Sequence, residues 1–494
     1  MDSSVPKREG SPCQQGVDSQ AAKVTRHSIP ELPEVYIFGH IHCLMTMREA
    51  ARAACVSRAF LRSWRGRPNL IFNEDMIGLK TSACRVNFCR EIDTILRNHS
   101  GIGVKIFKLV CRRMCEVDDT SRYLDSWLQV AVKPGIEEPT LMVCHTKTEY
   151  NFPCSLLSDG IRNSIRYLKL RCCGLHPAPE LGPLRSVTSL CLRIVSINGD
   201  ELECLLSNSL ALEQLELIFC SDIIRLKISC ALQQLTSLRV CLCCNLTAIE
   251  SKAPNLSSLG TVSKRGNTNF SLGETLQMKK MDVDCPNAVH YALTELPSIM
   301  PNLETLVIGS PTEVPNTPML PTKFLYLKHL TVHLISTSGM APFLPPYDYF
   351  SLVSFLDASP SLETLMLNAT PCRMKHENST LADASHLRHM PEHRHGCLKS
   401  FKISQFSSEK SLVELTCYIL KNAVSLECLT LNTNHGHRKC HLEIYGTCTL
   451  TTADRGLLAI RTYIEDKVPG SVKLTVLEPC SRCHGRGHCK LCNV

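Results

Sequence analysis

The sequence predicts an α/β protein, in which a short helical segment near the N-terminus precedes a solenoid of stacked repeats with a parallel strand face. Two observations predict this fold class. The pattern L-x-x-L-x-L recurs along most of the chain, and residues 29–66 carry apolar side chains at helical spacing. A single strand-and-return unit cannot cover its own apolar face, so neighbouring units stack and leave one strand face exposed.

The recurring pattern occurs eleven times between residues 165 and 431. The first eight copies start 22, 25, 23, 21, 22, 25 and 24 residues apart, and the last three steps are 35, 36 and 28. This pattern at a period of roughly 20 to 29 residues is typical of leucine-rich repeats, whose strand faces bind other macromolecules. The copies begin at Ile165, Val187, Leu212, Leu235, Leu256, Met278, Leu303, Leu327, Leu362, Leu398 and Leu426.

The composition is that of a folded, water-exposed protein. A chain of 494 residues exceeds one compact core, but a solenoid grows without that limit. Hydrophobic residues make up 44% and charged residues 20%, which excludes a largely disordered chain. The formal charge of +8 is modest and forms no dense basic stripe, so we expect no nucleic-acid partner.

The expected compartment is the cytoplasm, the nucleus or both. No run of 18 apolar residues predicts a membrane span, and the first twenty residues lack the apolar region of a secretory signal. The 29 cysteines are therefore expected to be thiols, which argues against a secreted receptor. Cys173, Cys220 and Cys243 fall three residues after the pattern's last apolar position, where a small side chain is buried.

Changes in pattern divide the chain into six parts. Residues 67–160 contain strand-like stretches that fit degenerate early repeats, and the C-terminal part combines two amphipathic helices with alternating strands. The predicted parts are a disordered lead at 1–28, the helical segment at 29–66, a linking region at 67–160, repeats at 161–397, a C-terminal module at 398–479 and a Cys-rich tail at 480–494.

The helical segment begins at Leu32-Pro33, because proline suits the first turn of a helix, where no amide donor is needed. Apolar residues then follow at helical spacing as far as Trp64. One interpretation is a cap that covers the first repeat, since the end of a solenoid is otherwise exposed.

The same segment resembles an F-box. That motif opens with Leu-Pro, continues with spaced aliphatic residues and ends in a Val-Ser-…-Trp segment over roughly forty residues, whereas Tyr36 and His40 depart mildly from it. The resemblance implies a surface for a Skp-type adaptor, which connects an F-box protein to a cullin. The implied adaptor-binding residues are Leu32, Pro33, Val35, Ile41, Leu44, Val56, Ser57 and Trp64.

The C-terminal module extends the resemblance. Residues 398–431 resemble the FBD module, with a strand, a polar turn, a helix that ends in Ile-Leu-Lys-Asn-Ala and a second strand. The chain is similar to plant F-box/FBD/LRR proteins. This implies a non-catalytic substrate-recognition subunit of an SCF-type E3 ubiquitin ligase. The alternative is a leucine-rich-repeat scaffold for protein interactions that acts outside a ligase.

The target protein, whose identity the sequence leaves open, is expected on the strand face. Residues between the pattern's leucines point outward there, although they are polar in any repeat protein. Holding the target near a ubiquitin-carrying enzyme raises its effective concentration and needs no acid–base chemistry in this chain. The candidate target-binding residues are Arg166, Lys169, Glu213, Glu216, Arg239, His329 and Thr331.

No metal, cofactor or catalytic site is predicted. Cys480, Cys483, Cys489 and Cys492 form two C-x-x-C pairs, the spacing of zinc ligands, but only five residues separate the pairs. Zinc ribbons separate theirs by roughly 15 to 20 residues, so a Cys-rich terminus without metal is the favoured interpretation. The chain also lacks the phosphate-binding, nucleophile-elbow and zinc-protease motifs.

Overall fold

The computed structural model of the protein describes residues 40–73, 84–100, 103–111, 120–143, 149–157, 159–178, 181–207, 209–264, 269–273, 275–313, 323–334, 347–369, 387–388, 393–433 and 448–478. The chain divides into two compact units, Met1–Trp64 and Arg65–Val494. The predicted disordered lead and Cys-rich tail lie outside the described residues.

The N-terminal unit is helical where it is described. Residues 40–44 are helical, and α2 (Met47–Ala54) and α3 (Arg58–Arg65) follow. Thr46 begins α2 through a reciprocal cap: its Oγ1 accepts from the Glu49 amide at 3.3 Å, and the Glu49 carboxylate accepts from the Thr46 amide at 3.0 Å. Ser57 Oγ accepts from the Phe60 amide at 3.2 Å, which satisfies a donor in the first turn of α3.

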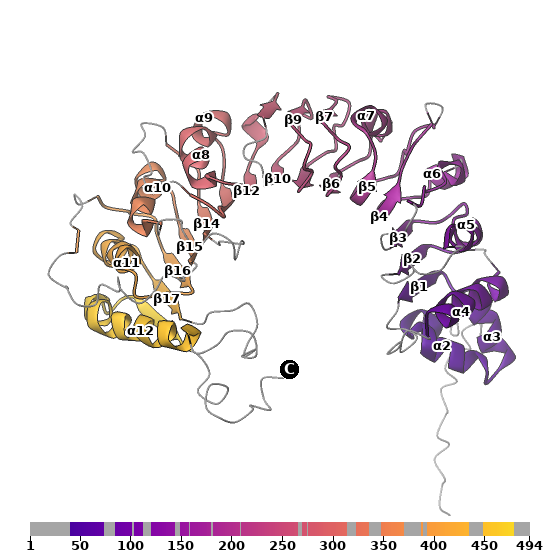
Figure 1. The fold of residues 1–494 in the computed structure, drawn as a ribbon, viewed down its shortest axis with the longest axis horizontal. Helices are drawn as coiled ribbons and strands as arrows, with labels where there is room; N and C mark the ends of the chain where they lie inside the picture. The colour runs from indigo at the N-terminus through magenta and orange to yellow at the C-terminus, as the bar shows by residue number, and fades with distance from the viewer. Residues whose placement is uncertain are drawn as a thin grey trace, which may run out of the picture. The chain divides into compact units, whose positions relative to one another are not determined.

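The C-terminal unit is built on one fifteen-stranded parallel sheet (Figure 1). Each of the eleven predicted repeats contributes one strand, as the sequence pattern predicted. The strands are β1 (Asn69–Asn73), β2 (Ile106–Val110), β3 (Glu138–Met142), β4 (Tyr167–Gly174), β5 (Ser189–Ser196), β6 (Gln214–Ile218), β8 (Ser237–Cys241), β10 (Ser258–Val262), β12 (Lys280–Asp284), β13 (Thr305–Gly309), β14 (His329–Leu334), β15 (Thr364–Ala369), β16 (Ser400–Ser404), β17 (Cys428–Asn432) and β18 (Lys473–Leu477).

The pattern's leucines form the core beneath this sheet. Leu168, Leu190 and Leu215 are register partners on β4, β5 and β6, and all three are buried. Two residues further along each strand, Leu170 and Leu192 form a second buried row with the same register. Because side chains alternate across a strand, the residues between these leucines lie on the opposite face of the sheet.

The linking region and the C-terminal module belong to the same sheet. Strands β1, β2 and β3 of residues 67–160 pair in parallel and join β4, so the strand-like stretches there are early repeats. At the other end, β16, β17 and β18 continue the ladder without a break. The predicted amphipathic helices of the C-terminal part are α11 (Lys410–Asn422) and α12 (Cys448–Tyr463).

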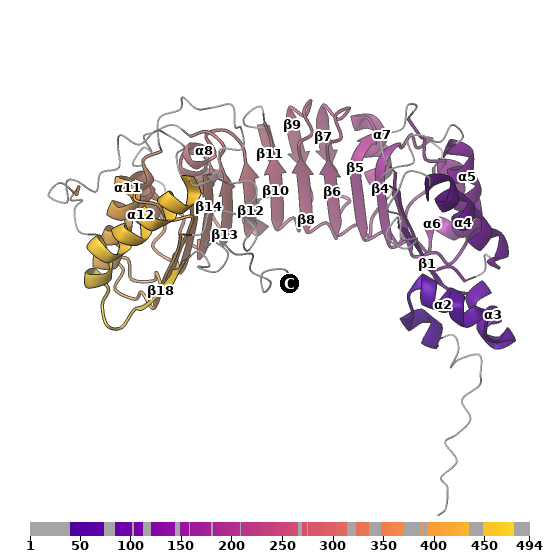
Figure 2. The ribbon, with the colours of Figure 1, turned by 60° about the horizontal axis from the view of Figure 1, so that its bottom comes forward.

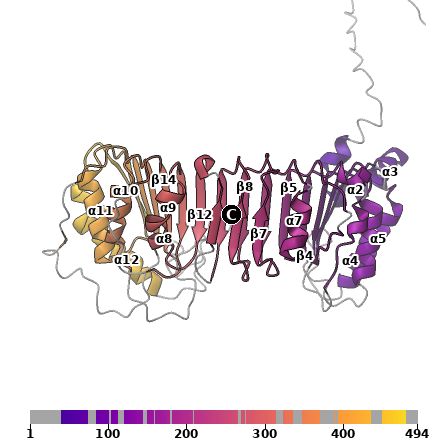
Figure 3. The same cartoon turned by 90° about the horizontal axis from the view of Figure 1, so that it is seen from above.

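Helices cover the face of the sheet opposite to the outward-pointing polar rows (Figures 1 and 3). Long steps between strands leave room for a helix, whereas the shortest steps do not. The helical segments are α4 (Cys84–Asn98), α5 (Thr120–Ala131), η3 (Cys154–Leu156), α6 (Asp159–Arg162), α7 (Gly199–Ser207), η4 (Thr275–Gln277), α8 (Ala288–Thr294), α9 (Leu296–Ile299), η5 (Tyr349–Leu352), α10 (Val353–Ala358), α11, α12 and η8 (Glu465–Lys467).

The three successive steps of 23, 21 and 22 residues return by a strand instead of a helix. Strands β7 (Arg225–Ile228), β9 (Ala248–Ser251) and β11 (Asn269–Leu272) form a second, three-stranded parallel sheet (Figure 2). The sequence pattern predicted the inner parallel strand face but not this outer sheet. Steps of 23, 21 and 22 residues leave too few residues for a helix, and the alternating Arg-Leu-Lys-Ile of β7 suits a strand.

Candidate interaction surfaces

Two apolar side chains stand out on the N-terminal unit. Leu44 is 77% exposed and Val56 is 80% exposed, and both are among the residues implied to bind an adaptor. Ile41, Ser57 and Trp64 are partly exposed. Leu32, Pro33 and Val35 lie outside the described residues.

The interior of this unit explains why Leu44 and Val56 remain outside. His42 is buried, and its ring lies 5.1 Å from that of Phe60, between centroids. Met47 and Ala50 on α2 are buried as well. Leu44 and Val56 are therefore not needed to complete the packing of these short helices, and they are available to a partner.

The second candidate surface is the polar face of the fifteen-stranded sheet, which we call the open face. Side chains line up across it in rows, because every strand pair of the sheet is parallel and in regular register. The central row, from β2 to β16, contains Lys108, Thr140, Lys169, Cys191, Glu216, Arg239, Gly260, Asp282, Val307, Thr331, Met366 and Lys402.

A neighbouring row of the open face, which we call the third row, lies two residues beyond the central row along each strand. Over the same strands it contains Val110, Met142, Arg171, Arg193, Ile218, Cys241, Val262, Asp284, Gly309, His333, Asn368 and Ser404.

The structure brings together only some of the predicted target-binding residues. Lys169, Glu216, Arg239 and Thr331 share the central row, but Thr331 is four strands away from Arg239. His329 begins β14. Arg166 and Glu213 precede their strands, at the edge where consecutive repeats are joined by backbone hydrogen bonds.

Glu216 and Arg239 are direct neighbours in a polar network of the central row. Cys191 Sγ donates to Glu216 Oε2 at 3.1 Å, and Arg239 Nη2 lies 3.8 Å from Asp282 Oδ2. Burial, reinforced by Glu216, raises the pKa of the Cys191 thiol to about 12, so this cysteine is protonated at neutral pH. Gly260 separates Arg239 from Asp282 in the row and leaves space for the arginine side chain, which a Cβ would approach to 3.3 Å.

A third-row polar group further along the face centres on Asp284. A Cβ at Gly309 would lie 2.6 Å from Asp284 Cγ, so only glycine leaves room for this carboxylate. Burial and the nearby Asp282 raise the pKa of Asp284, whereas His333 lowers it. Asn368 Nδ2 and His333 Nδ1 lie 2.6 Å apart.

Sequence reasoning missed Arg171 and Arg193, which are direct partners in the third row. Each follows the last leucine of its pattern, Leu170 or Leu192. The predicted target-binding residues were taken from between the leucines, so this position was not included. Both strands then pass through a left-handed residue, with φ of 57° at Cys172 and 53° at Ile194.

On the helical side, Arg388 connects the insertion between β15 and β16 to α11. Its Nε donates to Glu414 Oε2 at 2.8 Å, and its Nη1 and Nη2 donate to Asp348 at 2.7 Å each. The guanidinium carbon also lies 4.8 Å from the centre of the Phe350 ring. Nearby, His393 Nδ1 lies 2.8 Å from Asp357 Oδ1. The Arg388 and His393 side chains therefore both have partners within the fold.

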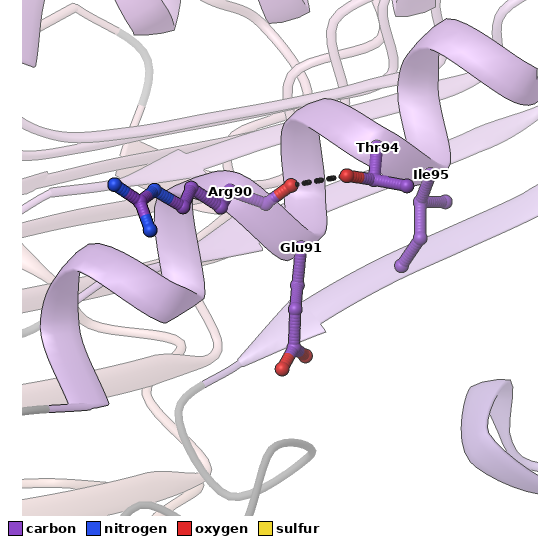
Figure 4. Close-up of a pocket in the computed structure, with 4 residues that line it drawn as sticks. All are labelled: Arg90, Glu91, Thr94 and Ile95. Carbon is purple, nitrogen blue, oxygen red and sulfur yellow. Dashed lines mark hydrogen bonds between the residues drawn. The ribbon is translucent and has the colours of Figure 1, made fainter.

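A depression of about 380 Å³ lies on the surface of α4 (Figure 4). Arg90, Glu91, Thr94 and Ile95 line it, and Thr94 Oγ1 donates to the Arg90 carbonyl at 2.7 Å. All four residues belong to one helix, and the hydroxyl is satisfied within that helix. The depression therefore offers no set of converging polar groups for a ligand.

The described residues contain no group of three or more His, Cys, Asp or Glu side chains placed to hold a metal ion. Cys480, Cys483, Cys489 and Cys492 lie outside them. The cysteines that the structure describes are free thiols, and Cys173 and Cys220 are buried at their predicted repeat position, whereas Cys243 is partly exposed. None of the described helices has the length and apolar character needed to cross a membrane.

Comparison with known proteins agrees with the repeat architecture. A family model described as "At1g61320/AtMIF1, LRR domain" matches residues 95–481. The match begins within α4 and ends after β18, so it covers most of the fifteen-stranded sheet. No curated protein matches the chain.

Proposed function

The chain belongs to the At1g61320/AtMIF1 leucine-rich-repeat family, and from that premise we propose that it is the substrate-recognition subunit of an SCF-type ubiquitin ligase. Residues 40–64 would dock on a Skp-type adaptor, and through it on a cullin, while the open face holds the target protein. In this proposal the chain itself carries out no chemistry. The repeat domain supports the coarser role of a protein-interaction scaffold.

The exposed pair Leu44 and Val56 carries the adaptor half of the proposal. Large apolar side chains at such exposure are normal singly, but here two of them flank α2 within a segment that resembles an F-box. Burying both against a partner would contribute on the order of 3 kcal/mol before association costs, enough for them to matter to binding.

The test is capture of the adaptor by purified protein carrying Leu44→Asp and Val56→Asp. We expect at least about a tenfold loss of capture, because two buried apolar contacts become desolvated charges. Leu325→Asp is the matched control, since Leu325 is a similarly exposed leucine on the C-terminal unit, and it should leave capture unchanged. Leu32→Ala with Pro33→Ala tests the segment's predicted start.

Full capture by both double variants, with unchanged thermal melting, would show that this segment does not bind the adaptor. The scaffold acting outside a ligase would then be the better proposal. A second measurement separates the two directly: in cells, the ligase subunit should co-purify with a cullin in a Leu44- and Val56-dependent manner, whereas the scaffold should not.

The target half of the proposal places a protein segment across the open face. Glu216 and Arg239 are neighbours at its centre, and Lys169 lies two strands before Glu216. A charge reversal there, such as Arg239→Glu, should weaken target binding while adaptor capture persists, because adaptor capture depends on residues 40–64.

A further inference from the structure

Two arginines of the open face are placed directly beside each other. Arg171 on β4 and Arg193 on β5 are register partners in the third row, and neighbouring strands lie about 4.8 Å apart. Like charges in directly opposed positions repel each other. Neither arginine lies within ion-pair distance of a carboxylate in the described parts of the chain, although both interact with the Cys172 thiol, which the Arg171 side chain contacts.

The two side chains are also partly withdrawn from water. Both are only partly exposed, and the Nε atoms of both are buried without a hydrogen-bond partner among the described residues. Buried donors in folded proteins are nearly always paired, so two such atoms on adjacent strands point to a missing acceptor. An anion bound between the arginines would offset the repulsion and give the two guanidinium groups a shared acceptor.

Lys169 is a third positively charged residue near Arg171 and Arg193. It precedes Arg171 by two residues on β4 and therefore lies on the same face. We call Lys169, Arg171 and Arg193 the basic cluster. The nearest acidic residue of the central row, Glu216, accepts from Cys191 and borders Arg239, so it does not neutralise the cluster. In the third row, the uncharged residues Met142 and Ile218 lie on either side of the two arginines, so the basic cluster ends there.

We propose that the basic cluster binds the phosphate of a phosphorylated side chain on a target segment that lies across β4 and β5. This rests on the proposed role of the open face in holding a target. A phosphate monoester carries nearly two negative charges and three terminal oxygens, so it can accept from two guanidinium forks and an ammonium together. A single carboxylate has two oxygens and one charge, which leaves donors unsatisfied.

The surroundings favour one localised anion over a polyanion. Asp282 and Asp284 occupy the same face on β12, and the formal charge of the whole chain is only +8. A nucleic acid that followed the face would meet these carboxylates, whereas a protein segment with one phosphate would not need to.

The direct test uses the purified full chain and fluorescent degenerate peptides with a fixed central phosphoserine, phosphothreonine, serine or glutamate. We expect a phosphorylated pool to bind at least about tenfold more tightly than the serine and glutamate pools, because hydrogen bonds between charged groups are stronger than neutral ones and phosphate accepts more of them. Arg171→Gln with Arg193→Gln should remove that preference. Arg171→Lys with Arg193→Lys should restore part of it.

Lys108→Gln is the matched control, because it removes one cation of the same face that is already paired with Glu138 at 3.2 Å, and the preference for phosphate should survive it. The Arg171→Gln, Arg193→Gln protein should melt at the same or a higher temperature without peptide, because repulsion and unpaired donors are removed. Equal binding of the glutamate and phosphorylated pools would indicate an acidic segment and overturn the proposal.

Two other results would also overturn it: a phosphate preference that survives Arg171→Gln with Arg193→Gln, and stabilisation by inorganic phosphate with no binding of any phosphorylated pool. These assays contain no adaptor. A failure of adaptor capture therefore leaves them unchanged, and a failure here leaves adaptor capture unchanged.

Discussion

At the scale of single residues, buried polar groups couple the stability of the sheet's first strands to pH. His99 is buried, and its Nε2 lies 2.9 Å from the Arg67 carbonyl oxygen. Burial lowers the pKa of His99, which the Arg67 carbonyl partly opposes and Lys133 reinforces. The neutral imidazole is thus the form that the folded protein accommodates.

We predict that this histidine destabilises the protein in mild acid. Its folded pKa lies below the ordinary value of 6.5, so the unfolded chain binds the proton more readily. The contribution to stability is therefore complete above pH 6.5 and is lost as pH falls through the folded pKa. Chemical unfolding between pH 7.5 and 5 should show a smaller decline for His99→Gln than for wild type. An identical decline in both proteins would contradict this.

At the scale of secondary-structure elements, one ion pair connects α11 to Arg388, which lies between β15 and β16. The Glu414 side chain on α11 is 0% exposed, and Arg388 Nη2 lies 2.6 Å from its Oε2. Arg388 also donates its backbone amide to Glu414 Oε1 at 2.9 Å. Such an arrangement is retained only while both partners are present, because the desolvation cost of a lone buried charge is large.

We predict that Arg388→Ala lowers the free energy of unfolding by about 3 kcal/mol, since it leaves the Glu414 carboxylate buried without its cation. Adding Glu414→Gln to that variant should recover part of the loss, because the uncompensated charge is removed. Urea unfolding followed by circular dichroism measures both. If the double variant is less stable than Arg388→Ala alone, the charge is not the cause.

At the scale of the whole molecule, the repeat pattern predicted most of the fold. Leucines such as Leu168 and Leu190 recur at a fixed spacing because each must reach the same buried row, and that requirement is visible in one sequence. The outer sheet of β7, β9 and β11 was not predicted, because the choice between helix and strand there depends on neighbouring repeats and step length.

The candidate sites were less predictable than the fold. Glu216 and Arg239 were expected to point outward, and they do. The pairing of Arg171 with Arg193 requires the register between two strands, and that register follows from stacking rather than from either sequence segment alone. The adaptor surface rests on a motif whose first residues, Leu32 and Pro33, lie outside the described residues.

We further predict that the Cys-rich tail does not contribute to folding. The last strand of the sheet, β18, ends at Leu477, and its pairing with β17 needs no later residue. A chain that ends at Pro479 should therefore melt within a degree or two of the full-length protein and capture adaptor equally. Loss of one zinc ion per chain together with a clear drop in melting temperature would contradict the prediction.

Over six successive repeats, the edge where the strands begin carries alternating charges, which has a consequence for how repeats can be gained or lost there. Lys279, Glu304, Lys328, Glu363, Lys399 and Glu427 succeed one another there, joined by backbone hydrogen bonds from repeat to repeat. Side chains of the first three lie 3.4 and 3.6 Å apart. Removing one internal repeat brings two equal charges together, whereas removing two restores the alternation. Within these six repeats, an even number gained or lost therefore keeps the alternation of charge along the edge, and an odd number replaces one attractive contact by a repulsive one.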